Sequence, residues 1–173
     1  LDSADSALVI SVPTILRTLY VDLGVSNSSI NIISCGEPLD LSLACKIKQS
    51  NPYTFHNLYG CTEVSPWILY LNVLSYFESL ASIGDSSPIL PVGRPFSEVS
   101  LLLNANDELL VFSHSVFSGY LEYDNTQPFL TIGEHQFYNT GDKFQITDGY
   151  YYCNGRSNSA TKICGMFINP SII

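Results

Sequence analysis

The sequence predicts a parallel α/β half followed by a smaller antiparallel β module. In the first half, short apolar runs alternate with amphipathic segments, which is the strand–helix rhythm of a parallel sheet. In the second half, turn residues separate several short apolar runs, which is typical of antiparallel strands. The chain has 173 residues, of which 46% are hydrophobic and 12% aromatic, so it can bury a full core and is not a disordered chain.

Each expected element of the first half has a local signal. Pro13 stands at a first helical position and Gly24 follows the last apolar residue of the period, so the two bound a helix. Two later apolar runs lead into glycine-bearing loops around Gly36 and Gly60. Because ligands of parallel sheets bind in loops at the carboxyl ends of strands, these loops are candidate sites. The expected strands are 7–12, 30–34 and 53–57, and the expected helices are 13–23 and about 39–49.

A boundary between the two halves is predicted by the cluster Pro88, Pro91, Gly93 and Pro95. Beyond it, Asp148-Gly149 predicts a two-residue hairpin, because this pair readily adopts the left-handed conformation of such turns. The second half is small enough to be a barrel or a folded sheet. Its expected strands are 99–103, 109–112, 116–121, 143–147 and 150–154, with a turn at 104–107.

The charge balance excludes several classes of partner. Seven Lys and Arg against sixteen Asp and Glu give a net charge of −9, with the negative charges spread along the chain. A surface for nucleic acid or an anionic membrane needs clustered cations, so we expect neither partner. The start of the chain lacks the basic segment of a signal peptide. The longest apolar run, 67–74, is far shorter than the roughly 20 residues that span a bilayer.

The five cysteines indicate a reduced compartment. They are odd in number, widely spaced and without a Cys-x-x-Cys pair, and the three histidines are isolated, which argues against a zinc site and a disulfide framework. We therefore expect a cytoplasmic protein. Because an expected strand begins almost at Leu1, we also expect the chain to be a piece of a longer polypeptide.

The loop after the third expected strand carries side chains suited to a nucleotide. In Asn57-Leu58-Tyr59-Gly60-Cys61-Thr62-Glu63, the aromatic ring can stack on a base and the hydroxyl can donate to a phosphate oxygen. The carboxylate can hold Mg²⁺, which prefers oxygen ligands. A capping loop, in which Thr62 or Glu63 bonds nearby backbone amides, explains the same residues. Asp142 in Tyr138-Asn139-Thr140-Gly141-Asp142 can likewise chelate a ribose diol or make a turn, and Arg156 can be a solvated surface residue.

Six motifs occur in an order that distinguishes these readings. They are Cys35-Gly36-Glu37-Pro38-Leu39, Asn57-x-Tyr59-Gly60-x-Thr62-Glu63, Pro91-Val92-Gly93-Arg94-Pro95, Glu108-Leu109-x-Val111 with Gly119-Tyr120, Tyr138-x-Thr140-Gly141-Asp142, and Gly155-Arg156 with Lys162-Ile163-x-Gly165. In this order the set resembles the adenylate-forming superfamily, above all the amino-acid adenylation domains of nonribosomal peptide synthetases. The resemblance covers nearly the whole chain from Ile30 onward.

The resemblance implies a fold, a reaction and a nucleotide site. The fold would be the end of a parallel α/β subdomain followed by a small antiparallel β-barrel. The reaction would be ATP- and Mg²⁺-dependent activation of a carboxylate as an acyl-AMP, with release of pyrophosphate. By the same resemblance, Gly36, Glu37 and Pro38 flank the adenine, Tyr59 stacks on it with Asn57 near the exocyclic amine, Thr62 touches the α-phosphate, Glu63 binds Mg²⁺, Asp142 binds the ribose hydroxyls, and Arg156 lies on the ribose and phosphate side.

The resemblance also implies an acyl pocket and a carrier partner. The matching pocket positions form an apolar wall for a small or medium side chain: Ile33, Cys35, Leu58, Pro66 and Trp67. The run Thr62 to Trp67 is similar to that of eukaryotic enzymes that activate β-alanine. The product would pass to a phosphopantetheine thiol on a carrier-protein domain. The alternatives are an acyl-CoA or aryl-acid ligase of the same fold and a degenerate, non-catalytic nucleotide-binding module. We expect Cys35 and Cys61 to be apolar fillers rather than nucleophiles, and His56 to be packed or solvated.

Several departures from the family pattern lead us to expect only half of an active site. The phosphate loop and the amino-acid-binding Asp of such domains lie upstream, and the lid domain with its lysine lies downstream. The implied division is therefore a partial α/β subdomain over 1–90, a β-barrel over 91–155 and a hinge over 156–173, and the chain alone is expected to be inactive. Residues that replace the family's usual ones are Glu98, Asn139, Asn158, Cys164, Phe167 and Asn169.

Overall fold

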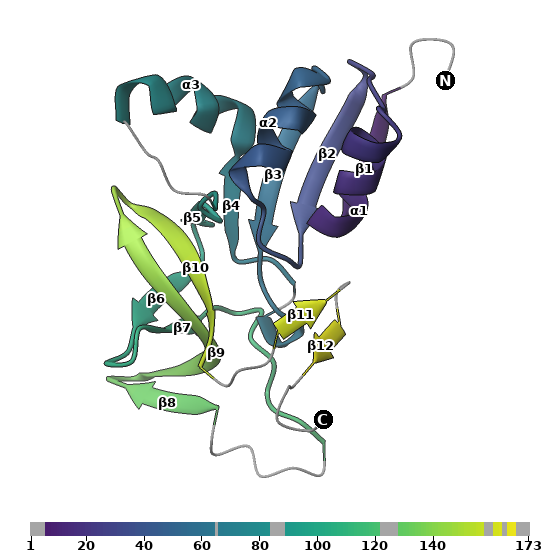
Figure 1. Cartoon of the computed structure of the whole chain (residues 1–173). Helices are drawn as coiled ribbons and strands as arrows, with labels where there is room; N and C mark the ends of the chain where they lie inside the picture. Colours follow the sequence, from purple (N-terminus) through teal and green to yellow (C-terminus); the bar gives the residue numbers. More distant parts are fainter. Residues whose placement is uncertain are drawn as a thin grey trace.

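The structure is a computed structural model that describes residues 6–64, 66–83, 89–121, 128–157, 161–163 and 166–168. Two main sheets follow each other along the chain (Figure 1). The expected combination of a parallel α/β half and an antiparallel half is confirmed. None of the described helices is long and apolar enough to cross a membrane.

The first sheet has five strands in the order β1-β2-β3-β4-β5. Its first three strands are parallel, and the last two run antiparallel to their neighbours. The strands are β1 (Ala7–Ser11), β2 (Ile30–Cys35), β3 (Thr54–Tyr59), β4 (Leu69–Asn72) and β5 (Arg94–Pro95). The three strands expected from the sequence are therefore present, and β3 extends two residues further, to Tyr59.

Three helices accompany this sheet, and two of them were expected. The helix expected over 13–23 is α1 (Pro13–Arg17) continued by a π-helical turn, η1 (Thr18–Asp22). The helix α2 (Leu41–Gln49) begins later than expected because Asp40 is its N-cap, with Oδ1 accepting from the Leu43 N–H at 2.9 Å. Strand β4 and helix α3 (Val73–Ile83) were not expected. The sequence nevertheless carries a signal for α3, because Val73, Tyr76, Phe77, Leu80 and Ile83 recur at the spacing of one helix face.

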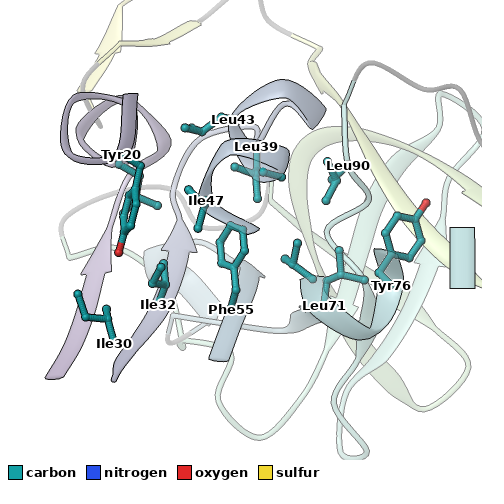
Figure 2. Packing of buried hydrophobic residues seen from close by; sticks show 13 residues of the cluster. Tyr20, Ile30, Ile32, Leu39, Leu43, Ile47, Phe55, Leu71, Tyr76 and Leu90 are labelled. Carbon is teal, nitrogen blue, oxygen red and sulfur yellow. The ribbon is translucent and has the colours of Figure 1, made fainter. Parts of the chain in front are cut away.

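Side chains from the helices and from one face of the first sheet form its core (Figure 2). Ile32 and Phe55 lie opposite each other on β2 and β3 and are fully buried, and Leu43 and Ile47 of α2 pack against them. The opposite face is more open, since Leu8 and Ile10 of β1 are 59% and 49% exposed. The alternation of buried and exposed residues along each strand thus separates a core face from an open face.

The second sheet is antiparallel, with the order β10-β9-β7-β6 and with β8 paired to β9. Within the described part of the chain these pairings do not close it into a barrel, so it is the folded-sheet form of the expectation. Asp148 (φ 52°) and Gly149 (φ 75°) form the expected hairpin between Thr147 and Tyr150. The strands are β6 (Ser100–Leu103), β7 (Glu108–Phe112), β8 (Phe129–Ile132), β9 (His135–Thr147) and β10 (Tyr150–Arg156); a separate pair is β11 (Thr161–Ile163) with β12 (Met166–Ile168).

The strand expected over 116–121 is wrong. This segment is irregular, and its backbone bonds to the short 3₁₀ turn η2 (Thr62–Val64) instead of to a neighbouring strand: the Phe117 N–H donates to the Glu63 carbonyl at 2.8 Å. Strand β8 and the first half of β9 were not expected either. The substitutions noted at Asn158, Cys164 and Asn169 lie outside the described residues, as does most of the expected hinge.

The two halves are joined by a shared core and by backbone pairing. Val92 N–H donates to the Tyr151 carbonyl at 2.8 Å, and Tyr151 N–H donates back to the Gly93 carbonyl at 2.9 Å. A second core cluster joins Ile68 and Leu69 of the first half with Val111 and Phe144 of the second. Because this core crosses the boundary near residue 90, the halves are held in one arrangement, and the loops at their junction face common neighbours.

Candidate functional site

The carboxyl ends of β2 and β3 lie side by side, because Cys35 pairs with Leu58 in the parallel register. The loops at Gly36 and Gly60 therefore start at the same edge of the sheet, as expected from the sequence. Gly60 has no room for a side chain: a Cβ there would lie 1.7 Å from the Pro66 carbonyl oxygen. The close approach of these two backbone segments shapes the loop that carries Thr62 and Glu63.

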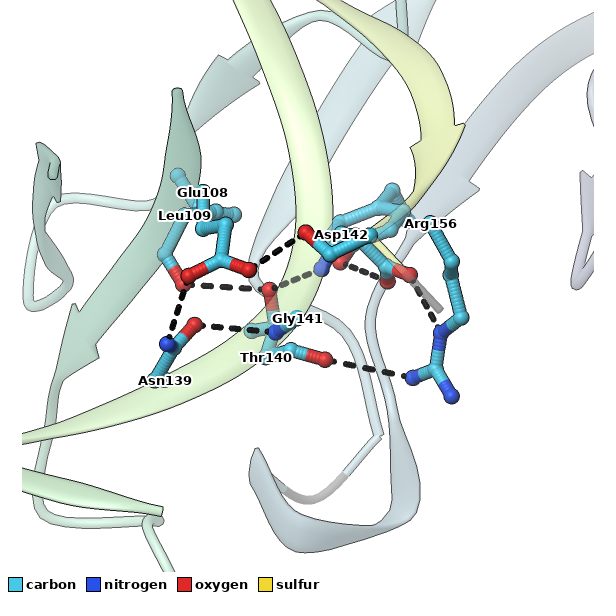
Figure 3. A network of polar contacts seen from close by, with 9 residues as sticks. Glu108, Leu109, Asn139, Thr140, Gly141, Asp142 and Arg156 are labelled. Atoms are coloured by element: carbon cyan, nitrogen blue, oxygen red, sulfur yellow. Dashed lines mark hydrogen bonds and ion pairs between the residues drawn. The ribbon is translucent and has the colours of Figure 1, made fainter. Parts of the chain in front are cut away.

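Asp142 is the centre of a compact polar network (Figure 3). The Tyr59 hydroxyl donates to Asp142 Oδ2 at 2.5 Å, and Arg156 Nε donates to Asp142 Oδ1 at 2.5 Å. Arg156 Nη2 also donates to the Thr140 carbonyl at 3.2 Å. Three candidate residues from the ends or middles of β3, β9 and β10 thus meet at one carboxylate. The carboxyl group of Asp142 is 12% exposed and the Arg156 side chain 23%, so the pair is largely shielded from water.

The local backbone presents Asp142 to these partners. Gly141 has φ 69°, a left-handed conformation that interrupts the regular strand β9. The Thr140 hydroxyl donates to the Leu109 carbonyl at 3.0 Å and accepts from the Asp142 N–H at 3.1 Å. The Thr-Gly-Asp order therefore makes a local turn and aims the carboxylate at Tyr59 and Arg156, while a ribose contact of Asp142 stays a prediction.

Protonation states in this network are set by the same contacts. Burial, reinforced by the charge of Asp142, raises the pKa of Tyr59 well above its usual value, so Tyr59 remains a hydroxyl donor at neutral pH. Burial lowers the pKa of Arg156, but the hydrogen bond and charge of Asp142 outweigh it and raise that pKa overall. The network is thus a neutral donor and a cation on one carboxylate.

Glu63 lies next to this network in the turn η2. Its carboxylate Oε1 accepts from the Tyr120 hydroxyl. Burial alone raises the pKa of Glu63, but hydrogen bonds from Tyr120, the backbone and Cys61, together with the charge of Arg156, hold it below its usual range. Glu63 is therefore an anion within electrostatic reach of Arg156. Thr62, beside it, is exposed.

Asn57 and Ser34 are two buried polar residues opposite each other on β3 and β2. Asn57 Nδ2 donates to the Pro91 carbonyl at 3.3 Å, while Asn57 Oδ1 and Ser34 Oγ have no hydrogen-bond partner among the described residues. Buried acceptors without partners are destabilising and rare. An unused acceptor at Asn57 fits a donor such as an exocyclic amine, and the amide donor is already engaged in holding the segment before β5.

The first glycine-bearing loop does a structural task that the sequence did not predict. Glu37 Oε2 accepts from the Thr14 N–H at 3.1 Å and from the Thr14 hydroxyl at 2.7 Å. Thr14 is in the first turn of α1, so Glu37 satisfies one of the free N–H groups at the start of that helix. Gly36 and Pro38, on either side, are exposed.

The expected pocket residues divide into a sheet face and a loop. Ile33, Cys35 and Leu58 alternate with the core residues of β2 and β3, so they share the face opposite the core. Leu58 is buried, and the other two are half-buried. Pro66 is exposed and Trp67 half-buried in the loop before β4, where Pro66 approaches Gly60.

Cys61 and His56 are two further residues whose side chains could react. Burial and the nearby charge of Glu63 raise the pKa of Cys61 to about 12, so the thiolate that a nucleophile needs is scarce at neutral pH. Burial lowers the pKa of His56, which keeps its ring neutral. Both observations support the expectation that these residues pack rather than react.

The sequence assigned no role to two residues that the structure puts at the site. Tyr120 contacts Glu63 across 57 positions of sequence. Glu108 accepts from Asn139 at 2.9 Å, from Asn104 at 2.7 Å and from the Ser157 hydroxyl, and so ties β9 to the residue after Arg156. Both residues belong to quoted motifs, so the motif order was a signal for them.

Comparison with known proteins identifies relatives of the chain. A scan against protein-family models found no match. Among curated proteins, the D-alanine–D-alanyl carrier protein ligase of Bacillus anthracis is 26% identical over 182 residues, covering 95% of this chain and 35% of that protein. The chain therefore spans about a third of the length of the curated relatives it matches.

Two solved structures have the same fold as the chain. The adenylation domain AlmE of Vibrio cholerae, in complex with glycyl-adenosine-5′-phosphate, has a TM-score of 0.79 at 23% identity, covering 94% of this chain and 34% of that one. The o-succinylbenzoate coenzyme A synthetase of Bacillus subtilis, in complex with ATP and a magnesium ion, has a TM-score of 0.71 at 20% identity, covering 95% and 34%.

The similar proteins belong to one class. The relatives and structural neighbours are adenylate-forming enzymes, and the chain has the fold of about a third of such an enzyme. Within that class, the curated relative is a carrier-protein ligase, and the solved structures are an adenylation domain and a coenzyme A ligase. The resemblance stated from the six motifs is confirmed.

Proposed function

We propose that the chain is part of an ATP-dependent adenylation enzyme that activates an amino-acid carboxylate as aminoacyl-AMP and releases pyrophosphate. The activated acid would then pass to a phosphopantetheine thiol on a carrier protein. One observation carries the proposal: Tyr59 and Arg156, from motifs far apart in sequence, both hydrogen-bond to the carboxylate of Asp142 beside Glu63. The order of these motifs in the sequence independently favours nucleotide binding.

The bonding capacity of Asp142 supports a ribose contact. A carboxylate has about four acceptor sites, and Tyr59 and Arg156 occupy one on each oxygen. The remaining sites can accept from two vicinal hydroxyls, which are donors. The Tyr59 ring is held in place by its hydroxyl on Asp142 and by an edge contact with Phe144 at 4.9 Å, so it is preorganised to stack on a base.

The charges around Glu63 support a phosphate contact. Arg156 supplies a cation beside Glu63, and Thr62 supplies an exposed hydroxyl in the same turn. Mg²⁺ is commonly held by one or two carboxylates together with phosphate oxygens, and Glu63, an anion beside the exposed hydroxyl of Thr62, fits that role. When bound, Mg²⁺ would neutralise charge that develops on the phosphates. Arg156 and the η2 turn would orient the α-phosphate for attack by the acid.

Within this proposal, the kind of acid and its acceptor are inferred from the similar proteins. The curated relative is named for a D-alanine and a carrier protein, and one solved neighbour holds a glycyl adenylate. Both acids are small. An apolar wall of Ile33, Cys35, Leu58 and Trp67 suits a small or medium side chain. Another small amino acid, β-alanine, is suggested by the run from Thr62 to Trp67.

ATP–pyrophosphate exchange by the intact polypeptide that contains this chain tests the proposal. The acids offered would be glycine, D-alanine, β-alanine and the larger amino acids, with aryl and fatty acids as a second panel. Exchange with one amino acid supports the proposal and identifies the substrate. Glu63→Gln is expected to lower exchange at least tenfold, because a charge-assisted contact contributes about 1.5–3 kcal/mol. The matched control is Glu134→Gln, at an exposed turn between β8 and β9.

An acyl-CoA or aryl-acid ligase is the second candidate, because a coenzyme A synthetase shares the fold. Exchange with the aryl or fatty panel and none with amino acids would favour it. ATP binding without exchange for any acid would favour a non-catalytic nucleotide-binding module and contradict both enzymatic proposals.

A further inference from the structure

We propose that Tyr120 is a positioning residue for Glu63: its hydroxyl fixes the carboxylate in the orientation that a nucleotide-bound divalent cation requires. This inference rests on the proposed function, in which Glu63 holds the cation. Tyr120 is 45% exposed and comes from the segment between β7 and β8, far from the loop that carries Glu63. Its hydroxyl donates to Glu63 Oε1 and to no other atom of that carboxylate.

One backbone and one side-chain hydrogen bond anchor the Tyr120 segment on the η2 turn. The Phe117 N–H donates to the Glu63 carbonyl at 2.8 Å. The Ser115 hydroxyl donates to the Val64 carbonyl at 3.0 Å. Both anchors bind the turn that carries Glu63, so the backbone of this residue and its carboxylate are held by the same segment. The same contact explains why 116–121 is not a strand: the Phe117 N–H bonds to η2 rather than to a neighbouring strand.

Aromatic packing keeps the Tyr120 ring in place. Phe117 meets Tyr120 edge-on at 4.8 Å and Tyr138 edge-on at 5.4 Å. Tyr138 is 5% exposed and belongs to the second core cluster. Through Phe117, the ring of Tyr120, whose hydroxyl binds Glu63, is therefore packed against that core.

The known effect of hydrogen bonds on metal-binding carboxylates indicates what Tyr120 contributes. A carboxylate that binds a metal is usually held by a hydrogen bond to its other oxygen, and loss of such a partner typically lowers metal affinity 10–100-fold. A Glu side chain is flexible, so a fixed orientation also lowers the conformational entropy lost when the cation binds. Tyr120 touches Glu63 and not the reacting atoms, so its effect should appear in cation binding rather than in the chemical step.

The test uses Tyr120→Phe in the intact polypeptide, which removes one oxygen atom from a half-exposed side chain. The probe is Mn²⁺ with a non-hydrolysable ATP analogue, followed by electron paramagnetic resonance, and thermal unfolding is measured in parallel. We expect Mn²⁺ to bind 10–100-fold more weakly, with an unchanged unfolding temperature and an unchanged affinity for the metal-free analogue. In exchange assays, the Mg²⁺ concentration for half-maximal rate should rise while the KM for the acid stays constant. Tyr53→Phe, the same change at a 72% exposed tyrosine, is the matched control.

Distinct outcomes separate the inference from the proposed function. If wild-type protein does not bind the Mn²⁺–nucleotide pair, the proposed function fails and the inference falls with it. If wild type binds and Tyr120→Phe binds equally well, only the inference is overturned. Should Tyr120→Phe not fold, Phe117→Leu decides, because loss of the edge contact that holds the Tyr120 ring must weaken Mn²⁺ binding in the same direction; wild-type affinity in that variant overturns the inference.

Discussion

Replacement of Asp142 by Asn is the most informative single change to the site. Asn keeps the shape of the side chain and one acceptor oxygen, but its amide group would face either the Tyr59 hydroxyl or Arg156 Nε, both of which are donors. One charge-assisted hydrogen bond is lost, which costs about 1.5–3 kcal/mol. Arg156 also loses its counterion.

The exposure of the pair limits the size of this effect. Removal of one partner from a fully buried ion pair costs about 3–5 kcal/mol. Arg156 is 23% exposed, so water solvates part of the guanidinium that the variant leaves behind. We therefore expect the free energy of unfolding to fall by about 2–4 kcal/mol. Loss of the ribose contact should raise the KM for ATP about tenfold or more.

Urea unfolding and ATP–pyrophosphate exchange on the intact polypeptide measure both effects. Asp148→Asn is the control, because it makes the same chemical change in the β9–β10 turn, where Asn tolerates the left-handed backbone (φ 52°) equally well. Its unfolding free energy should stay within about 0.5 kcal/mol of wild type. Wild-type stability in Asp142→Asn would refute the central role of this carboxylate. Reduced stability with an unchanged KM for ATP would refute the ribose contact alone.

Three further predictions test the surrounding structure. Gly60→Ala should destabilise the protein by about 1–3 kcal/mol and reduce exchange, because the new Cβ would lie 1.7 Å from the Pro66 carbonyl oxygen; urea unfolding that matches wild type would contradict this close approach. Hydrogen bonds from Ser157, Asn139 and Asn104 lower the pKa of Glu108 below its ordinary 4.5, so its stabilisation is present above pH 4.5 and is lost as the pH falls through the lower folded value. Unfolding measured from pH 7 downward should therefore show a weaker acid dependence for Glu108→Gln, and an unaltered profile would argue against this linkage. Phe55→Ala should cost about 3–5 kcal/mol, because the ring is fully buried between β2, α2 and β4; a loss below about 1 kcal/mol would show that this core is not packed as described.

Local sequence signals predicted the elements whose ends they mark. Asp148-Gly149 predicted a hairpin that is present, because few other dipeptides adopt that turn. Pro13 predicted the first residue of α1. Strand β4 and helix α3 were missed although a signal is present: Asn72, a common N-cap residue, precedes apolar residues at helical spacing, and its Oδ1 accepts from the Ser75 N–H at 3.2 Å.

The motif residues were predictable individually, but their contacts were not. The motif order identified Tyr59, Glu63, Asp142 and Arg156 as nucleotide-site candidates, and their roles toward a nucleotide stay predictions. The structure adds that Tyr59 and Arg156 share one carboxylate. It also gives Glu37 a role at the start of α1, which no spacing in the sequence indicates.

The sequence by itself determined the fold class, the hairpin and the set of candidate residues, because periodicity, turn chemistry and motif order act over a few neighbouring positions. Tertiary structure alone decided which of these residues meet. The contacts Tyr59–Asp142 and Tyr120–Glu63 span 83 and 57 positions of sequence and depend on how two sheets pack across a shared core. The segment 116–121 shows the same limit. Its apolar residues predict a strand, but the segment lies against η2, because the Phe117 N–H and the neighbouring Ser115 hydroxyl bond to the carbonyls of Glu63 and Val64.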